Sequence, residues 1–155
     1  MDEGRSSLGC MTETTFDQPF PLGEPNDAFA QYFIGQSYLA PLVGGSTPVS
    51  NVTFEPGCRN NWHVHHGEDG GGDQILLCTA GSGWYQADGE EPVRMRPGTS
   101  IRVPAGTKHW HGAAEDSWFS HPAFITPGEG VRNEWLEPVT DEVYEQLPTT
   151  DGENA

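Results

Sequence analysis

Short apolar segments separated by glycine and proline turns recur through the middle of the chain. Residues 49–54 (VSNVTF) alternate between apolar and polar positions and end in EPG, a sequence typical of a turn. Residues 74–88 contain an apolar run (ILLC), a Gly-Ser-Gly bend and a second apolar segment. Further strands are predicted at residues 30–43, 91–96, 100–104, 108–114 and 117–125. Only residues 141–147 (DEVYEQL) have helical spacing, so the pattern predicts an all-β sandwich or barrel.

The two ends of the chain lack this periodicity. Residues 1–25 and 148–155 are polar and aperiodic, and both are predicted to be poorly ordered tails. Residues 26–147 are expected to form a single domain, long enough to bury one hydrophobic core. The 20 glycines, the 13 prolines and the hydrophobic fraction of 34% fit short strands with tight turns better than a helical bundle.

Charge and targeting signals narrow the range of partners. The 23 acidic residues against 7 basic ones give a net charge of −16, which would repel nucleic acid and anionic membrane surfaces. No apolar run approaches the roughly 18 residues of a membrane span, and the first ten residues lack the apolar segment of a secretory signal. The cysteines, Cys10, Cys58 and Cys78, match no paired spacing, so no disulfide framework is expected. These features predict a cytoplasmic protein that acts on a small molecule.

All six histidines lie between residues 63 and 121. His63 and His65 are two residues apart, as are His109 and His111, so the members of each pair share one face of a strand. His121 belongs to a further predicted strand. Neutral imidazoles from separate strands are good ligands for a first-row divalent ion. The pattern therefore predicts a metal site, and the alternative is a set of hydrogen-bonded core histidines.

The histidine pairs lie within two motifs that resemble those of the cupin family. In this chain the first motif consists of Gly57, five residues, His63-Val-His65, then Gln74, six residues and Gly81. The second consists of Gly98, five residues, Pro104-Ala-Gly106 and His109, and sixteen residues separate the two motifs. The resemblance covers about residues 48–126 and implies a jelly-roll β-barrel. It also implies one divalent metal per chain, bound by His63, His65, Gln74 and His109.

The chain departs from the family pattern at two places. Eight residues (HGEDGGGD) separate His65 from Gln74, about twice the usual spacing. The glycines of this insertion allow a bulged loop that returns Gln74 to the cavity, and the register of the following strand favours Gln74 as the ligand. Alternative ligands within the insertion are His66, Glu68, Asp69 and Asp73. In the second motif, Ala113 stands where the family usually has asparagine.

The expected ligand set has a chemical consequence. A carboxamide from Gln74 leaves the charge of a divalent ion intact, so three imidazoles and one amide would make an electron-poor Lewis acid. The oxygen ligand favours Mn or Fe, with Zn and Ni as alternatives. His111 and His121 are predicted to lie beside this site as general acid and base. The alternative for both is structural support of the ligands.

Further segments of the sequence resemble one particular group within the family. The sequences GWYQ, KHWHGAA and SWFSH resemble small bacterial cupins of the hydroxynitrile lyase type, relatives of which accompany carboxymuconolactone decarboxylase domains. This resemblance implies a dimeric, metal-dependent lyase that cleaves or forms cyanohydrins such as mandelonitrile, with His111 and His121 assisting proton transfer. A homodimer is expected to form through residues 30–39, which would add to a partner's sheet edge.

Three other functions fit the family, because one fold supports many chemistries. A non-haem iron dioxygenase would use the histidines to activate oxygen, and a non-catalytic cupin would bind a metal or small ligand beside a decarboxylase. An isomerase or decarboxylase for hydroxy or keto acids would need cationic groups, for which the candidates are Arg59, Arg94, Arg96 and Arg102. The tryptophans near the motifs, Trp62, Trp84, Trp110 and Trp118, are expected to pack the fold or to line an aromatic pocket.

Overall fold

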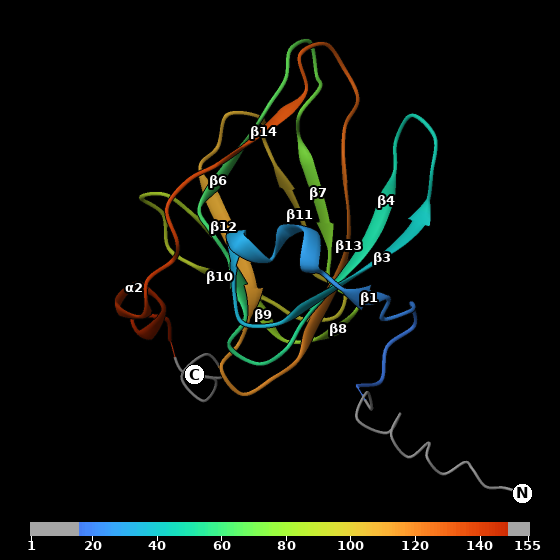
Figure 1. The fold of residues 1–155 in the computed structure, drawn as a ribbon. Helices are drawn as coiled ribbons and strands as arrows, with labels where there is room; N and C mark the ends of the chain where they lie inside the picture. The colour runs from blue at the N-terminus through green and yellow to red at the C-terminus, as the bar shows by residue number, and fades with distance from the viewer. Residues whose placement is uncertain (1–15, 149–155) are drawn as a thin grey trace, which may run out of the picture.

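The computed structural model describes residues 16–148, which form two antiparallel β-sheets (Figure 1). The first sheet has the strand order β1 (Glu24–Pro25), β3 (Ser37–Val43), β4 (Val49–Phe54), β13 (Phe119–Ile125), β7 (Gln74–Leu77) and β11 (Ser100–Val103), with β8 (Ala80–Gly81) also paired to β13. The second has the order β10 (Val93–Met95), β9 (Gly83–Ala87), β12 (His109–Ala113), β5 (Arg59–Asn60) and β2 (Phe33–Ile34). In the same sheet β6 (His63–His66) pairs with both β12 and β14 (Arg132–Trp135).

This architecture confirms the all-β prediction. Among the described residues no ladder of hydrogen bonds joins the two sheets, so they form an open jelly-roll sandwich instead of the closed barrel that the resemblance implied. The main core lies between the sheets, where Phe54, Leu76, Met95 and Phe119 are completely buried. Each such side chain stabilises the fold by about 1.5–3 kcal/mol relative to an exposed position. The space beside this core, on the same inner faces, holds the histidines.

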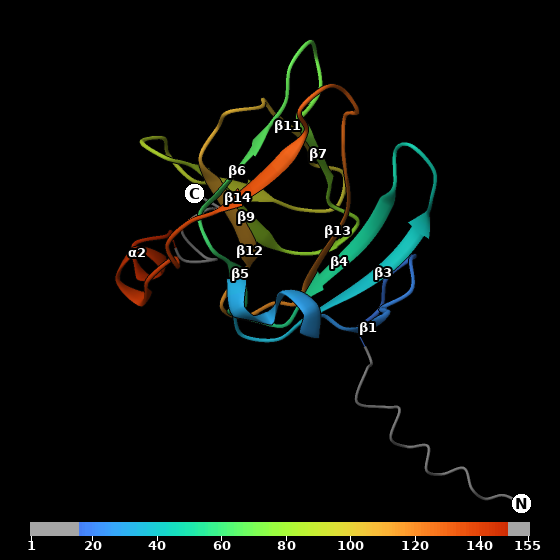
Figure 2. The same cartoon turned by 45° about the horizontal axis from the view of Figure 1, so that its top comes forward.

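Residues 16–25, predicted to belong to a poorly ordered tail, lie within the described range. They include β1 (Glu24–Pro25), which pairs with β3 at the edge of the first sheet (Figure 2). Gln18 Nε2 donates to Thr53 Oγ1 at 3.0 Å, and Asn51 Nδ2 donates to Gln18 Oε1 at 2.9 Å. The polar positions of β4, which the alternating pattern would place in solvent, are therefore buried under this segment. The contacts are between polar groups, so no hydrophobic periodicity marked them. Residues 1–15 and 149–155 of the predicted tails lie outside the described range.

Residues 30–43 form two strands in different sheets, where the apolar pattern predicted one. A short 3-10 helix (Asp27–Tyr32) leads into β2, and the chain turns at Gly35 before β3. Gly35 has φ +92°, and a Cβ there would lie 2.9 Å from Cys58, so only glycine fits this turn. β2 pairs with β5, and β3 pairs with β4 and β1. The segment expected to reach a partner chain is therefore hydrogen bonded within its own chain.

The predicted helix is confirmed as α2 (Asp141–Glu145), which packs on the outer face of the second sheet (Figure 1). Thr140 caps it, because its side chain accepts a hydrogen bond from the Val143 N–H at 3.3 Å. Beneath it lies a cluster of Trp62, Trp84 and Trp110, so these tryptophans pack the fold as predicted. None of the helices in residues 16–148 is long and apolar enough to cross a membrane.

Candidate metal centre

Four strands bring the predicted site residues to one place between the sheets. β6 carries His63 and His65, β7 begins at Gln74, and β12 carries His109 and His111. His121 comes from β13, which lies beside β7 in the first sheet, whereas β6 and β12 belong to the second sheet. His63 and His109 are direct cross-strand neighbours. All six side chains are buried, with exposed fractions of 8% or less.

The side chains expected to bind the metal are within contact distance. Gln74 Oε1 lies 3.1 Å from His65 Nε2 and 3.1 Å from His109 Nε2. The ring centroids of His63 and His109 are 4.3 Å apart, and those of His63 and His65 are 4.9 Å apart. The His111 ring centroid lies 5.5 Å from that of His63 and 5.7 Å from that of His109. Ligand atoms of His63, His109 and His111 all lie within 4.8 Å of one another, a spacing that suits a metal ion.

The imidazole rings of His63, His65 and His109 are each oriented by a hydrogen bond from Nδ1 to an oxygen acceptor. His63 Nδ1–H donates to Asn61 O at 2.8 Å, and His109 Nδ1–H donates to Thr107 O at 3.0 Å. His65 Nδ1–H donates to Asn133 Oδ1 at 2.6 Å. Because each Nδ1 carries the proton, each Nε2 keeps a free lone pair directed toward the site.

The chemistry of this donor set fits a divalent cation. Gln74 Oε1 faces the unprotonated Nε2 atoms of His65 and His109, so three lone pairs converge where no hydrogen atom lies between them. A cation bound among them would convert this repulsion into attraction. The opposite amide rotamer would also satisfy the histidines, because the Gln74 NH₂ group could donate to both nitrogens. The two orientations of the Gln74 amide differ in their affinity for a divalent ion, because only the orientation with Oε1 facing His65 and His109 presents a third lone pair to it.

Burial keeps the histidines neutral, as metal ligands must be. Desolvation lowers the pKa of His63 and His111 well below the usual value of 6.5 and lowers that of His65 in the same direction. Burial also lowers the pKa values of His109 and His121 to about 4. At neutral pH all five imidazoles are therefore uncharged, and no like-charge repulsion opposes their grouping.

His111 and His121 form a pair next to the candidate ligands. His121 Nε2 lies 3.1 Å from His111 Nδ1, so one of these nitrogens donates to the other. Asn60 holds His111 from the other side: its Oδ1 accepts the His111 backbone N–H at 2.9 Å, and its Nδ2 lies 3.4 Å from both ring nitrogens. Two linked neutral imidazoles are suited to pass a proton.

The site opens into a cavity of about 190 Å³. Its polar lining consists of His63, His65, His111, His121, Gln74 and asparagines. Its apolar lining consists of Phe29, Phe33, Leu39, Val52, Ala123, Ile125 and Trp135. Because a cavity of about 150 Å³ holds benzene, this one has room for a single ring with a small substituent. No lysine or arginine among the described residues lines it.

The alternative ligands within the insertion do not line this cavity. His66 Nε2 is hydrogen bonded to Glu134 Oε1 at 2.8 Å, and Asp73 accepts hydrogen bonds from Ala105 N and Arg102 Nε. Glu68 and His66 border a separate surface pocket. Gln74 is therefore the residue of this segment that the strand register places inside. Ala113, at the other departure from the family motif, is buried in the main core.

Three residues of the site had no signal in the sequence. Asn60 lies in the five-residue spacer between Gly57 and His63 of the first motif, while Asn133 and Trp135 belong to β14, a strand that the alternation did not predict. β14 pairs with β6, placing Asn133 opposite His65 and Trp135 opposite His63. The sequence RNEW has no apolar alternation, so only its pairing with a histidine strand identifies its role.

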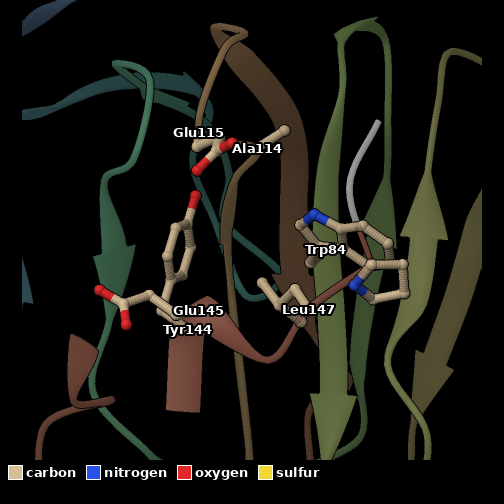
Figure 3. A pocket seen from close by; sticks show the side chains of 7 residues that line it. Trp84, Ala114, Glu115, Tyr144, Glu145 and Leu147 are labelled. Carbon is tan, nitrogen blue, oxygen red and sulfur yellow. The ribbon is translucent and has the colours of Figure 1, made fainter. Parts of the chain in front are cut away.

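A second pocket of about 190 Å³ lies between α2 and the outer face of the second sheet, where Figure 3 shows Trp84, Tyr144 and Leu147 around it. It shares no lining residue with the histidine cavity. Its polar side chains are the Tyr144 hydroxyl and the carboxylates of Glu115 and Glu145. The grouped imidazoles thus occur in the inner cavity, not here.

Comparisons with known proteins agree with this fold and site. Residues 50–119 match the family described as a cupin domain. The (R)-mandelonitrile lyase of Granulicella tundricola is 38% identical over 119 residues, which cover 74% of this chain and 87% of that protein. A crystal structure of a cupin-like protein from Thermotoga maritima superposes with a TM-score of 0.76 at 34% identity, covering 86% of this chain and 98% of that one. The antiparallel jelly roll, the matched domain and the identity to these relatives show that this chain belongs to the cupin family.

Proposed function

We propose that this protein is a metal-dependent lyase that cleaves or forms cyanohydrins. The observation that carries the proposal is the convergence of His63, His65, Gln74 and His109, with their lone pairs directed inward, beside the linked pair of His111 and His121. The similarity to the (R)-mandelonitrile lyase of Granulicella tundricola supports the choice of reaction.

His63, His65, Gln74 and His109 would hold one divalent ion per chain, with Mn or Fe favoured and Zn or Ni as alternatives. When bound, such an ion acts as a Lewis acid that makes a hydroxyl group easier to deprotonate. The neutral amide of Gln74 preserves the charge on which this effect depends. The protein contributes the ring orientations set by Asn61, Thr107 and Asn133.

The proposed substrate is an uncharged cyanohydrin with one ring. The size of the cavity and its apolar wall fit such a molecule. The absence of lysine and arginine from the described lining argues against anionic hydroxy or keto acids. The arginines considered for such acids have other partners: Arg59 bonds Val139 O and Asp141, Arg94 bonds Ser82, and Arg102 bonds Asp73.

His111 and His121 would manage the proton. In the cleavage direction His111 accepts the proton of the substrate hydroxyl, and the oxygen electrons form the aldehyde C=O as the bond to the nitrile carbon breaks. The departing cyanide takes that bonding pair and receives the proton back from the imidazole pair as hydrogen cyanide. Burial lowers the pKa of His121 to about 4 and that of His111 well below its usual range, so both start as neutral bases.

A non-haem iron dioxygenase is the second candidate. The grouping of His63, His109 and His111 within 4.8 Å favours it, because three histidines without a carboxylate are also a plausible iron site. Oxygen uptake by the iron-loaded protein with a diketone or thiol substrate, without mandelonitrile cleavage, would favour this reading over the lyase.

The first test is elemental analysis of the purified protein together with release of benzaldehyde from mandelonitrile, with His63→Ala as the control. We expect about one Mn or Fe per chain and catalysed cleavage, both lost in the control. A protein that stays metal-free after reconstitution and does not cleave mandelonitrile would contradict the lyase proposal and leave a ligand-binding cupin.

A cytoplasmic location and a homodimer complete the proposal. The dimer is proposed from the family resemblance. Within residues 30–39, β2 is the edge strand of the second sheet, and β3 lies between β1 and β4 in the first sheet, so a dimer through this segment would extend the sheet at β2. Light scattering at about one chain mass would contradict the dimer.

A further inference from the structure

The eight-residue insertion between His65 and Gln74 is a tightly bonded structure and not a loose loop. It lies against the turn between β13 and β14, at the end of the molecule shown at the top of Figure 1. We call residues 67–73 and 126–130 together the clasp. Gly72 N–H donates to Thr126 O at 2.9 Å, Thr126 N–H donates to Asp73 O at 2.8 Å, and Glu68 N–H donates to Glu129 O at 3.0 Å.

Glycines allow the two halves of the clasp to approach this closely. A Cβ on Gly71 would lie 2.7 Å from Gly128 Cα, and a Cβ on Gly128 would lie 2.8 Å from Gly71 Cα. A Cβ on Gly67 would lie 2.3 Å from Gly71 O. The glycine-rich composition of the insertion therefore serves close packing of backbones, which a flexible linker would not require.

Thr126 is the centre of the clasp. Its hydroxyl accepts the Asp73 N–H at 3.0 Å and donates to Gly70 O at 2.8 Å. This one side chain thus fixes the last residue before Gln74 to the first residue after β13. Ile125 and Gln74 are paired across the strands at the same level, so the clasp closes directly on the ligand-bearing end of β7.

Asp73 ties the clasp to the second metal-binding motif. Its carboxylate accepts hydrogen bonds from Ala105 N at 2.8 Å and Arg102 Nε at 2.9 Å. The turn that contains Ala105 also reaches two candidate ligands: Gly106 N–H donates to His65 O at 2.8 Å, and Thr107 O accepts from His109 Nδ1 at 3.0 Å. At its other end the clasp continues into β14, where Asn133 holds the His65 ring.

We propose that the clasp is a positioning device of this chain, in which Thr126 and Asp73 together set the orientation of Gln74 and His65 toward a bound divalent ion. This inference rests on the proposed metal site. It assigns a role to the insertion that interrupts the cupin motif: the insertion replaces the short connection of the motif with a longer one made rigid by its own hydrogen bonds. Thr126 and Asp73 act through the ligands and do not themselves bind the ion.

The test uses Thr126→Val, which removes the hydroxyl and preserves the shape of the side chain. The matched control is Thr99→Val, because Thr99 Oγ1 also accepts a backbone N–H, that of Arg96 at 3.1 Å. Thr99 lies beyond the far end of β7, where Ser100 pairs with Leu77, so it is remote from Gln74. Binding of Mn²⁺ alone is measured by electron paramagnetic resonance of the free ion. We expect Thr126→Val to weaken Mn²⁺ binding about tenfold, as loss of supporting contacts does at metal sites, with no change in Thr99→Val.

A second readout does not depend on the metal. In the metal-free protein, NMR of the Gln74 side-chain amide and of the His65 ring nitrogens should report one ordered arrangement in the wild type and Thr99→Val, and a shifted or broadened one in Thr126→Val. Asp73→Asn, which loses the ion pair with Arg102 but keeps an acceptor for Ala105 N, should change both readouts in the same direction and by less.

The outcomes separate the two proposals. Equal Mn²⁺ affinity in the wild type and all three variants, with unchanged NMR signals, would overturn the proposed role of the clasp and leave the metal site standing. Failure of the wild type to bind Mn²⁺ or Fe²⁺ would overturn the metal-dependent function, and the NMR comparison would still decide whether the clasp orders Gln74 and His65. If Thr126→Val does not fold, Asp73→Asn decides by the same two readouts.

Discussion

The two faces of strand β12 differ in chemistry although they belong to the same five residues. His111 lines the inner cavity and His109 contacts Gln74 beside it, while Trp110 between them is completely buried in the outer cluster beneath α2. The side chains on the inner face are polar and titratable, and their burial costs desolvation free energy. The side chain on the outer face is large and apolar, and its burial stabilises the fold. The alternation of a strand thus lets one segment carry reactivity and stability on opposite sides.

The pockets beside these two faces show the same difference. Each has a volume of about 190 Å³. The inner one is lined by histidines whose protons and orientations are set by hydrogen bonds, whereas the outer one has tyrosine and glutamate side chains at its edge (Figure 3). Size alone does not distinguish a functional site, but the number of pre-oriented donor atoms does. Substitutions on each face should therefore affect different measurements.

The largest effect is expected from His109→Ala on the inner face. It removes a candidate metal ligand and one of the two imidazoles that contact Gln74 Oε1. We expect metal content to fall to background and mandelonitrile cleavage to fall by at least about 10⁴-fold, equivalent to about 5 kcal/mol of transition-state stabilisation. Metal content and turnover are measured on the same preparation. Retention of one bound ion per chain would show that His109 is not a ligand.

Acidification should also act on the inner face. Burial lowers the folded-state pKa of His109 and His121 to about 4, whereas each titrates near 6.5 when unfolded. As pH falls below 6.5 the unfolded chain takes up protons first, so stability is complete above this value and declines toward pH 4. Each histidine should contribute a loss of about 3 kcal/mol across that window. Denaturant unfolding of the metal-free protein at pH 7.5, 6, 5 and 4 measures this, and a constant free energy of unfolding would contradict it.

Trp110→Ala tests the outer face of the same strand. Trp110 is fully buried, and Trp62, Trp84 and Val139 belong to the same cluster. Its loss should lower the free energy of unfolding by about 3–5 kcal/mol. Metal bound per folded chain should not change, because the side chain does not reach the cavity. Chemical denaturation and metal analysis of the folded fraction check both parts. Loss of metal from fully folded protein would show that the two faces are coupled.

Much of the inner site could be predicted because its signals are local. Two histidines two residues apart must share a face of a strand, and the motif spacings placed Gln74 and His109 with them. The structure brings all four together with His111 and His121. Which of them bind an ion stays a prediction, since the three-histidine group with ligand atoms within 4.8 Å contains His111 instead of His65.

The parts that could not be predicted depend on contacts distant in sequence. Asn133 supports His65 across 68 residues, and its strand has no apolar alternation of its own. Gln18 covers Asn51 through polar hydrogen bonds, so the N-terminal segment was expected to be a tail. The insertion was expected to be a bulged loop, but its glycines pack against Gly128 in a turn about sixty residues further along the chain. In each case the conformation of the segment depends on contacts with residues distant in sequence, so the pattern within the segment alone does not predict that conformation.

His121→Asn should affect catalysis without loss of the metal. His121 is completely buried and contacts His111 at 3.1 Å, and asparagine keeps a polar group of smaller size at this position. We expect turnover of mandelonitrile to fall about 100-fold, equivalent to about 3 kcal/mol, within the usual contribution of acid–base catalysis. Metal content should stay near one ion per chain. A decrease in metal content that matches the decrease in turnover would assign His121 to ligand support instead of proton transfer.

The smallest effect is expected from Thr140→Ala at the start of α2. The Thr140 side chain accepts the Val143 N–H, so its removal leaves one helix donor without its cap. The free energy of unfolding should fall by about 1 kcal/mol, measured by urea denaturation. Because no residue of α2 lines the inner cavity, Mn²⁺ affinity and mandelonitrile turnover should equal those of the wild type. If Mn²⁺ affinity instead fell together with the free energy of unfolding, the change at the outer face would be transmitted to His109 through the backbone of β12. The two faces of this strand would then not act independently.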